Sequence, residues 1–292
     1  MPFSRAPPSR TRTVAPSPSF PPGPATIHGQ TTAKPRAFPP GLSLIIPAYN
    51  EEDRLRPTLE RYLPVLEGYG IPFEVLVVVD GSDQTEEIAR AFEDRHVRCL
   101  RYSQKLGRGG AILEGFRHAT LSLVAYADAD GSVPPDDLQK LVNIGLEKHL
   151  CVIASRRLDP RVVVVPERRW RRLVGWTWHA LVRVSLDVTV ADAQCGLKVF
   201  PHEVVDLILN RLTVTNRAFE VGMLYHVVNG GYSVVEVPVR YRHDFNTRMP
   251  IAKAVPVMFL TLVGLTLANR FRYRRALPIG AMERLNTVFR SV

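Results

Sequence analysis

The sequence predicts an α/β domain built on a mostly parallel sheet with helices on both faces. Three observations lead to this prediction. Short apolar runs alternate with longer amphipathic stretches, several of the runs are rich in valine and isoleucine, and polar clusters follow them. Continuous apolar strands are typical of parallel sheets that are covered on both faces, because each crossover helix packs against one face.

The predicted elements follow one another in a regular order. The first strand covers residues 42–47, an apolar run that ends in a proline. A helix follows over residues 51–66, and a β-branched run typical of a buried parallel strand covers residues 73–79. The alternation continues with helices over 85–92, 109–119 and 135–148 and with strands over 97–102, 123–127, 150–155 and 232–239.

The net charge of +10 is concentrated at the two ends of the chain. Residues 1–40 carry five cations and no acid, and residues 248–292 carry eight cations and one acid. The 207 residues between them carry 25 cations and 27 acids, so the middle is slightly acidic. This distribution argues against a nucleic-acid-binding core and for a membrane surface as the partner of the basic ends.

The same distribution predicts three parts of the chain. Residues 1–40 hold 11 of the 24 prolines and are expected to form a disordered Pro/Arg-rich tail, and residues 41–247 the folded domain. In the basic segment 248–292, the uncharged run 254–269 has 16 residues, fewer than the roughly 20 that span a bilayer. We expect a membrane-associated or core-packed amphipathic helix there. Three scattered cysteines fit a reducing compartment such as the cytosol.

Polar clusters follow three predicted strands, at residues 48–52, 80–83 and 128–132. Ligands of open parallel sheets bind beyond the carboxyl ends of the strands. Asp128 and Asp130, one residue apart, can present oxygen ligands to a divalent cation that bridges phosphate oxygens. The alternative is an ordinary Asx-turn and helix cap, because Asp, Gly and Ser also form such turns.

Six sequence blocks occur together in a characteristic order, which is LSLIIPAYNEE, VLVVVDGSDQT, QKLGRGGAILEGF, VAYADADGS, ADAQCGLKVF and NRAFEVGMLYHV. With these blocks the chain resembles the family 2 glycosyltransferases, over roughly residues 41–245. Within the family it is most similar to the synthases that transfer a sugar from a nucleotide sugar to dolichyl or polyprenyl phosphate. Residues 192–198 make the dolichyl-phosphate glucose synthases the nearest group. The resemblance implies the Rossmann-like GT-A fold.

The resemblance also implies a set of site residues. Asp130 is expected to bind Mg²⁺ or Mn²⁺, with Asp128 as a second candidate ligand or a support for ribose or a metal-bound water. Residues of the nucleotide and diphosphate pocket are expected to be Pro47, Ala48, Tyr49, Glu51, Asp80, Gly107, Arg108, Gly109, Asp128, Ala129 and Asp130. The chain departs from the family pattern in a shortened loop after Asp80, in Arg108 where Lys is common, and in Gly222 where a second acid is common.

The family reaction is a single displacement that inverts the anomeric centre. A phosphate monoester acceptor is already ionised near neutral pH, since its second pKa is about 6, so it needs cations more than a general base. Arg156 and Lys198 are the candidate phosphate-binding residues, and Asp192 is either a base, an acceptor-site carboxylate or a structural residue. The arginines around Trp170 are equally compatible with phosphate binding and with a solvated surface.

These expectations combine into a peripheral enzyme at the cytosolic face of a membrane. It is expected to move a hexose, with glucose favoured, from a nucleotide sugar, with UDP-glucose favoured, to polyprenyl or dolichyl phosphate. Alternatives are a GDP-mannose-dependent mannosyltransferase, a transferase with a hydroxyl acceptor, and a non-catalytic nucleotide-sugar-binding protein. No nucleic-acid partner is expected, and the sequence does not determine an oligomeric state.

Overall fold

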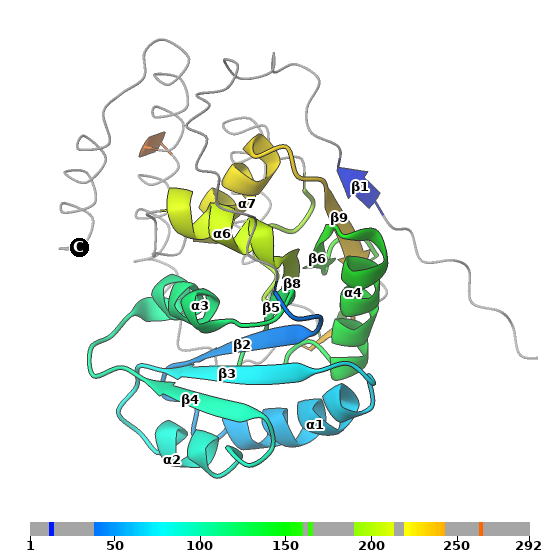
Figure 1. Ribbon diagram of the computed structural model, residues 1–292. Coiled ribbons are helices and arrows are strands. Elements are labelled where there is room, and N and C mark those ends of the chain that lie inside the picture. The colour runs from blue at the N-terminus through cyan, green and yellow to red at the C-terminus, as the bar shows by residue number, and fades with distance from the viewer. Residues whose placement is uncertain are drawn as a thin grey trace, which may run out of the picture.

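The computed structural model describes residues 12–14, 38–159, 163–165, 190–212, 219–242 and 263–264. In this part of the chain the central feature is an eight-stranded sheet with the order β1-β9-β6-β8-β5-β2-β3-β4 (Figure 1). Its strands are β1 Arg12–Val14, β2 Leu42–Ala48, β3 Phe73–Val79, β4 Val97–Arg101, β5 Leu123–Tyr126, β6 Cys151–Ser155, β8 Lys198–Pro201 and β9 Val234–Pro238. A separate pair joins β7 Val163–Val165 to β10 Tyr241–Arg242.

The sheet is mostly parallel, as predicted. β2 pairs in parallel with both β3 and β5, β3 with β4, and β6 with β9. β8 lies between β5 and β6 and runs antiparallel to both, and β1 runs antiparallel to β9. The carboxyl ends of β2, β3, β5 and β6 therefore meet at one edge of the sheet, where β8 begins.

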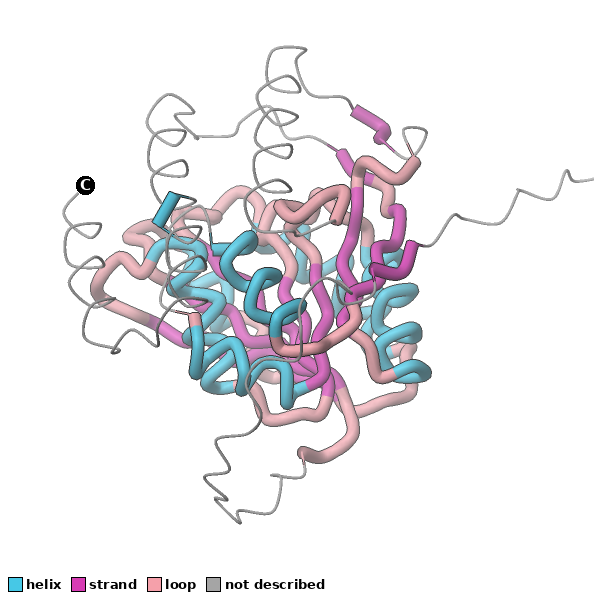
Figure 2. The backbone as a smooth tube through the Cα atoms, turned by 90° about the horizontal axis from the view of Figure 1, so that it is seen from above, coloured by secondary structure: helices cyan, strands magenta, loops and turns pink. Residues whose placement is uncertain are grey.

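Helices cover both faces of the sheet, which confirms the second part of the prediction. They are α1 Leu55–Glu67, α2 Thr85–Arg90, α3 Gly107–His118, α4 Pro135–Lys148, α6 His202–Arg211 and α7 Phe219–Asn229. α3, α6 and α7 pack in one apolar cluster, and α1, α2 and α4 pack in a second (Figure 1). Viewed at right angles, the strands again lie between helices (Figure 2).

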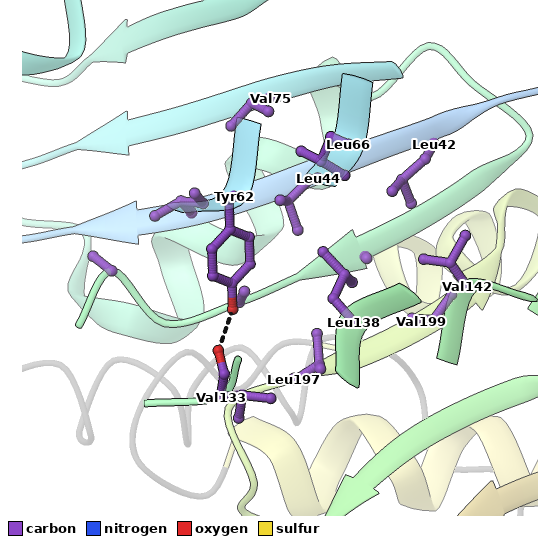
Figure 3. Close-up of a cluster of buried hydrophobic side chains, with 14 of the residues drawn as sticks. Leu42, Leu44, Tyr62, Leu66, Val75, Val133, Leu138, Val142, Leu197 and Val199 are labelled. Carbon is purple, nitrogen blue, oxygen red and sulfur yellow. Dashed lines mark hydrogen bonds between the residues drawn. The ribbon is translucent and has the colours of Figure 1, made fainter. Parts of the chain in front are cut away.

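The two clusters follow from the alternation of side chains along each strand. Ile45 of β2 belongs to the cluster with α3, whereas its neighbours Leu44 and Ile46 belong to the cluster with α1. Tyr62 of α1 lies fully within the second cluster, and its hydroxyl donates a hydrogen bond of 2.7 Å to the carbonyl of Val133 (Figure 3). This bond ties α1 to the loop that follows Asp130.

The observed elements differ from the predicted ones at a few places. α4 has the predicted bounds, while α1 begins at Leu55 rather than at residue 51. β8 was not predicted as a strand, and β1 lies inside the segment 1–40 that was expected to have no structure. The predicted C-terminal helix, apart from residues 263–264, and the region around Trp170 lie outside the described residues. Within the described residues, no helix has both the length and the apolar character needed to cross a membrane.

Candidate active site

The loops after β2 and β3 are locked together at the carboxyl edge of the sheet. Asn50 has φ of 55°, and its Oδ1 accepts the N–H of Ser82 at 2.9 Å. A Cβ on Gly81 would lie 2.4 Å from Asn50 Oδ1, so only glycine permits this approach. Tyr49, which follows Pro47 and Ala48 at the end of β2, is 44% exposed, and the ammonium of Lys105 lies 3.9 Å from its ring centroid. Tyr49 therefore lies at the rim of the site, whereas Ala48 is buried at the end of β2.

Glu51 lies behind this rim and interacts with the predicted metal ligands. Its N–H donates to Thr85 Oγ1 at 2.8 Å, and its carboxylate pairs with Arg54 at 2.6 Å. Burial raises the pKa of Glu51 to about 7 against the opposing charge of Arg54, and the charges of Asp130 and Asp128 raise it further. Glu51 therefore belongs to the same electrostatic cluster as the two aspartates.

Asp80 caps the start of α3. Its Oδ2 accepts the N–H groups of Leu106 and Gly107 at 2.7 and 2.9 Å, and Gly107 has φ of 69°, in the left-handed region that favours glycine. The N–H of Gly107, which was expected to face diphosphate, is therefore bonded to Asp80. The expected contact of Asp80 with the nucleobase stays a prediction.

Arg108, one residue further along α3, joins three parts of the site. Its Nε and Nη2 lie 2.9 and 2.8 Å from Asp128 Oδ1, and its guanidinium also pairs with Glu220 of α7. The same guanidinium lies 5.7 Å from the ring centroid of Tyr126. The structure thus brings together Asp128 and the arginine of the glycine-rich block, two residues that were expected in the same pocket.

The other oxygen of Asp128 is held against the segment that precedes β8. A Cβ on Gly196 would lie 1.7 Å from Asp128 Oδ2, so this carboxylate fits only beside a glycine. Gly196 does not have a positive φ angle that would itself favour glycine. The close approach of Asp128 therefore explains why glycine is needed at this position.

Asp130 forms the Asx-turn that was the alternative interpretation of its motif. Its Oδ1 accepts the N–H of Ser132 at 2.9 Å, and Gly131 between them has φ of 61°. Burial and the nearby charge of Asp128 raise the pKa of Asp130, although the bonds from Ser132 oppose this. A cation bound near Asp130 would oppose this effect and favour its ionised carboxylate.

The carboxylates of Asp128 and Asp130 fit a metal ion whose coordination shell is completed by oxygens of the substrate. Among the described residues, no group of three or more histidines, cysteines, aspartates or glutamates gathers as a metal site. Mg²⁺ commonly takes only one or two protein carboxylates and fills its remaining positions with phosphate oxygens and water. Asp128 and Asp130 supply a donor set of that kind, in which Ala129 between them is buried.

A second charged cluster follows β6. The Nε and Nη2 of Arg156 donate to Asp192 Oδ2 and Oδ1 at 2.7 and 2.9 Å, and its backbone N–H donates to Oδ2 at 3.0 Å. The guanidinium also lies 4.9 Å from the ring centroid of Tyr241. Burial alone would raise the pKa of Asp192, but the charge and hydrogen bonds of Arg156 lower it to about 2. This geometry argues against Asp192 as a general base and favours its structural role.

Lys198, one of the predicted phosphate-binding residues, lies buried at the start of β8. It has no exposed surface, its Nζ donates to the carbonyl of Cys195 at 2.7 Å, and it lies 5.3 Å from the ring centroid of Tyr126. Burial lowers the pKa of this ammonium to about 7. The burial of Lys198 and its bond to Cys195 favour a structural role, and its expected contact with the acceptor phosphate stays a prediction.

Two glutamates of the site were given no role from the sequence, although Glu220 is the acid that the late block keeps beside Gly222. Glu220 of α7 pairs with Arg108, and Glu236 of β9 accepts backbone N–H groups beside Asp192. Burial raises the pKa of Glu236, opposed by those N–H donors. The sequence feature that could have indicated them is a single acid inside an apolar run. This run is FEVGM for Glu220 and VVEVP for Glu236. The arginines around Trp170 lie outside the described residues.

Known proteins resemble the chain in both sequence and fold. The sequence model described as Glycosyl transferase family 2 matches residues 43–209, more than half of the chain. A dolichyl-phosphate beta-glucosyltransferase of Drosophila melanogaster is 33% identical over 217 residues, which cover 68% of this chain and 66% of that protein. The dolichyl-phosphate beta-glucosyltransferase of Homo sapiens is 29% identical over 232 residues, with coverages of 74% and 70%. The chain thus matches about two thirds of the length of these relatives.

A solved structure shows the same fold. Glucosyl-3-phosphoglycerate synthase from Mycobacterium tuberculosis, in complex with Mg²⁺ and uridine diphosphate, superposes with a TM-score of 0.59 at 18% identity. The match covers 79% of each chain, and it confirms the predicted GT-A fold. Together with the match of the family model, these observations show that the chain belongs to glycosyl transferase family 2.

Proposed function

We propose that the chain transfers a glucosyl residue from a nucleotide sugar to polyprenyl or dolichyl phosphate, with inversion at the anomeric carbon. One observation carries the proposal: two charged clusters, one acidic and one centred on Arg156, lie at the carboxyl ends of β5 and β6, two strands of one sheet that are separated only by β8. The names of the curated relatives support the glucosyl group and the lipid phosphate. UDP-glucose is the favoured donor.

The acidic cluster is assigned to the donor. Asp128 and Asp130 would hold Mg²⁺ or Mn²⁺, which when bound neutralises the charge that develops on the departing diphosphate. Arg108 already pairs with Asp128 and adds a cationic group at the start of α3. The locked loops after β2 and β3 fix the position of Tyr49 at the rim, where a nucleoside has an exposed aromatic surface to contact.

The cluster after β6 is assigned to the acceptor. A phosphate monoester needs no general base near neutral pH, because its oxygens are already ionised. Its binding needs an oriented cation, and the guanidinium of Arg156 is held in one plane by Asp192 and is still 20% exposed. Because Asp192 stays ionised far below neutral pH, it fixes Arg156 throughout the range in which the reaction runs.

A lipid phosphate places the reaction at a membrane surface. We assign the enzyme to the cytosolic face of a membrane as a peripheral protein, with the basic ends of the chain contacting anionic lipid. Five cations without an acid in residues 1–40, and eight cations with one acid in residues 248–292, support this assignment.

The proposal is tested with the purified full chain. It is incubated with Mg²⁺ or Mn²⁺, polyprenyl or dolichyl phosphate, and labelled UDP-glucose or GDP-mannose, and the lipid fraction is counted. We expect a glucosyl lipid from UDP-glucose, and NMR of the product should show the inverted anomer. Label from GDP-mannose would correct the donor, and label only in the presence of a hydroxyl acceptor would correct the acceptor. Transfer to no lipid phosphate from any donor would overturn the proposal.

A matched pair of variants checks the acidic cluster. Asp130→Asn keeps the shape of the side chain and removes its charge, so transfer should fall by at least about 100-fold while the fold is retained. Asp94→Asn removes the same charge from an exposed residue on the loop before β4 and should leave transfer unchanged.

A further inference from the structure

Glu236 is a fully buried acid in the middle of an apolar strand. It lies on β9, and its Cα partner on the neighbouring strand β6 is Ile153, three residues before Arg156. Removing a carboxylate from water is costly unless hydrogen bonds replace the lost hydration. An apolar residue would fill the same place in the strand without this cost. The formation of the strand therefore does not explain why a carboxylate occupies this position.

Both oxygens of Glu236 hold the segment that carries Asp192. Oε2 accepts the N–H of Ala191 at 2.7 Å, and Oε1 accepts the N–H of Asp192 at 3.0 Å. Two consecutive backbone N–H groups on two oxygens of one carboxylate restrain both the position and the rotation of this segment. Asp192 in turn accepts three hydrogen bonds from Arg156.

We propose that Glu236 is a positioning residue that acts through Asp192 to orient the guanidinium of Arg156 toward the acceptor phosphate. The proposal rests on the proposed function, in which Arg156 binds that phosphate. Glu236 itself has no exposed surface and contacts no substrate. Its effect passes from β9 to the segment before β8 and from there to the end of β6.

A second glutamate on the sheet provides a matched control. Glu74 lies on β3 and accepts the N–H of Thr120 at 2.8 Å, so it also anchors a loop through a backbone amide. It does so at the start of its strand, whereas the active-site residues lie at the strand ends. Glu74 also pairs with Arg98 at 3.2 Å, so Glu74→Gln removes an ion pair as well as a carboxylate oxygen, at a place in the sheet remote from Arg156.

The test compares Glu236→Gln with Glu74→Gln in the full-length enzyme. Glutamine retains the shape but turns an NH₂ group toward one of the two backbone N–H groups, so one hydrogen bond is lost. For Glu236→Gln we expect the KM for polyprenyl phosphate to rise about 10-fold, with the KM for UDP-glucose changed by less than about twofold. Glu74→Gln should change neither constant, and thermal unfolding should show both variants folded.

A double variant separates positioning from a general loss of structure. In an Arg156→Ala background, Glu236→Gln should have no further effect on the KM for the lipid phosphate, because the residue through which it acts is gone. An added effect in that background, or an equal loss for donor and acceptor, would overturn the proposal. If Glu236→Gln does not fold, Glu236→Asp, which keeps the charge but shortens the reach, should show the same division between the two KM values.

A measurement on the enzyme without substrates tests the positioning role of Glu236 separately from the identity of the acceptor. The Nε–H of Arg156 should give an NMR signal protected from solvent exchange in the wild type, and Glu236→Gln should reduce that protection while Glu74→Gln does not. Absence of lipid transfer by the wild type would overturn the proposed function alone. Unchanged protection in Glu236→Gln would overturn the positioning role itself.

Discussion

Gly196→Ala tests the contact between the segment before β8 and the acidic cluster. An alanine Cβ would lie 1.7 Å from Asp128 Oδ2 and 2.4 Å from its Cγ. Real Cβ atoms essentially never approach another heavy atom within 3.0 Å. To bring Oδ2 from 1.7 Å to that limit, the carboxylate must move by at least about 1.3 Å. Asp128 is a side chain that is 34% exposed and can rotate, so the movement falls on the carboxylate rather than on the fold.

The expected result is a large loss of activity with a small loss of stability. A displacement of about 1 Å in a catalytic site can reduce the rate by 100-fold, and the variant should show a kcat/KM for UDP-glucose reduced by about that factor. Its apparent affinity for Mn²⁺, measured by titration of activity, should weaken as well. The thermal midpoint should fall by no more than a few degrees, which corresponds to about 1 kcal/mol.

Gly68→Ala is the control for the effect of an added methyl group. Gly68 follows α1, and a Cβ there meets only carbonyl oxygens at 3.5 Å, an ordinary contact. This variant should keep full activity. Full activity of Gly196→Ala with an unchanged Mn²⁺ response would refute the reasoning that places Asp128 in the donor site.

Further outcomes are expected for stability and metal dependence. Asp192→Asn should lose about 2 kcal/mol of unfolding free energy at pH 7, because Arg156 holds the carboxyl pKa at about 2 instead of 3.8. A lowered pKa stabilises the fold above the unfolded value, so the difference from wild type should shrink as the pH falls from about 4 to 2 in urea titrations, and a constant difference would contradict the ion pair. Tyr62→Phe should cost about 1 to 2 kcal/mol in the same assay, since the buried carbonyl of Val133 loses its donor, with transfer unchanged. Chelation with EDTA should abolish transfer and added Mn²⁺ should restore it, whereas transfer that persists in EDTA would contradict the role of Asp128 and Asp130.

The regular part of the fold could be predicted because local pattern and tertiary environment agree there. α4 has the predicted bounds because Pro135 suits a helix start and its apolar residues recur at helical spacing. β8 was missed for the opposite reason. It has only four residues and begins with Lys198, a residue that is normally exposed, and its burial depends on the carbonyl of Cys195 and the ring of Tyr126.

The candidate site could be predicted in its residue types but not in its pairings. Acids and glycines at the strand ends are visible in the sequence, since parallel topology brings those ends together. The partner of each acid is decided by contacts between distant segments. Asp80 bonds to a backbone group 27 residues away, and the Arg156–Asp192 pair spans 36 residues. These separations in sequence explain why the sequence did not indicate that Asp80 caps α3 or that Asp192 pairs with Arg156.

The reversed direction of β8 divides the sheet into two parts that can vary separately. Its first residue, Lys198, pairs in register with Tyr126 at the end of β5 and also with Ile153 of β6. In the proposed function, the strands on the β5 side carry the cluster assigned to the donor, and those on the β6 side carry the cluster assigned to the acceptor. A substitution that alters acceptor choice on β6 or β9 therefore leaves the nucleotide half intact. We expect family members that share a donor but differ in acceptor to diverge mainly on the β6 side, which makes this architecture well suited to acquiring new acceptors during evolution.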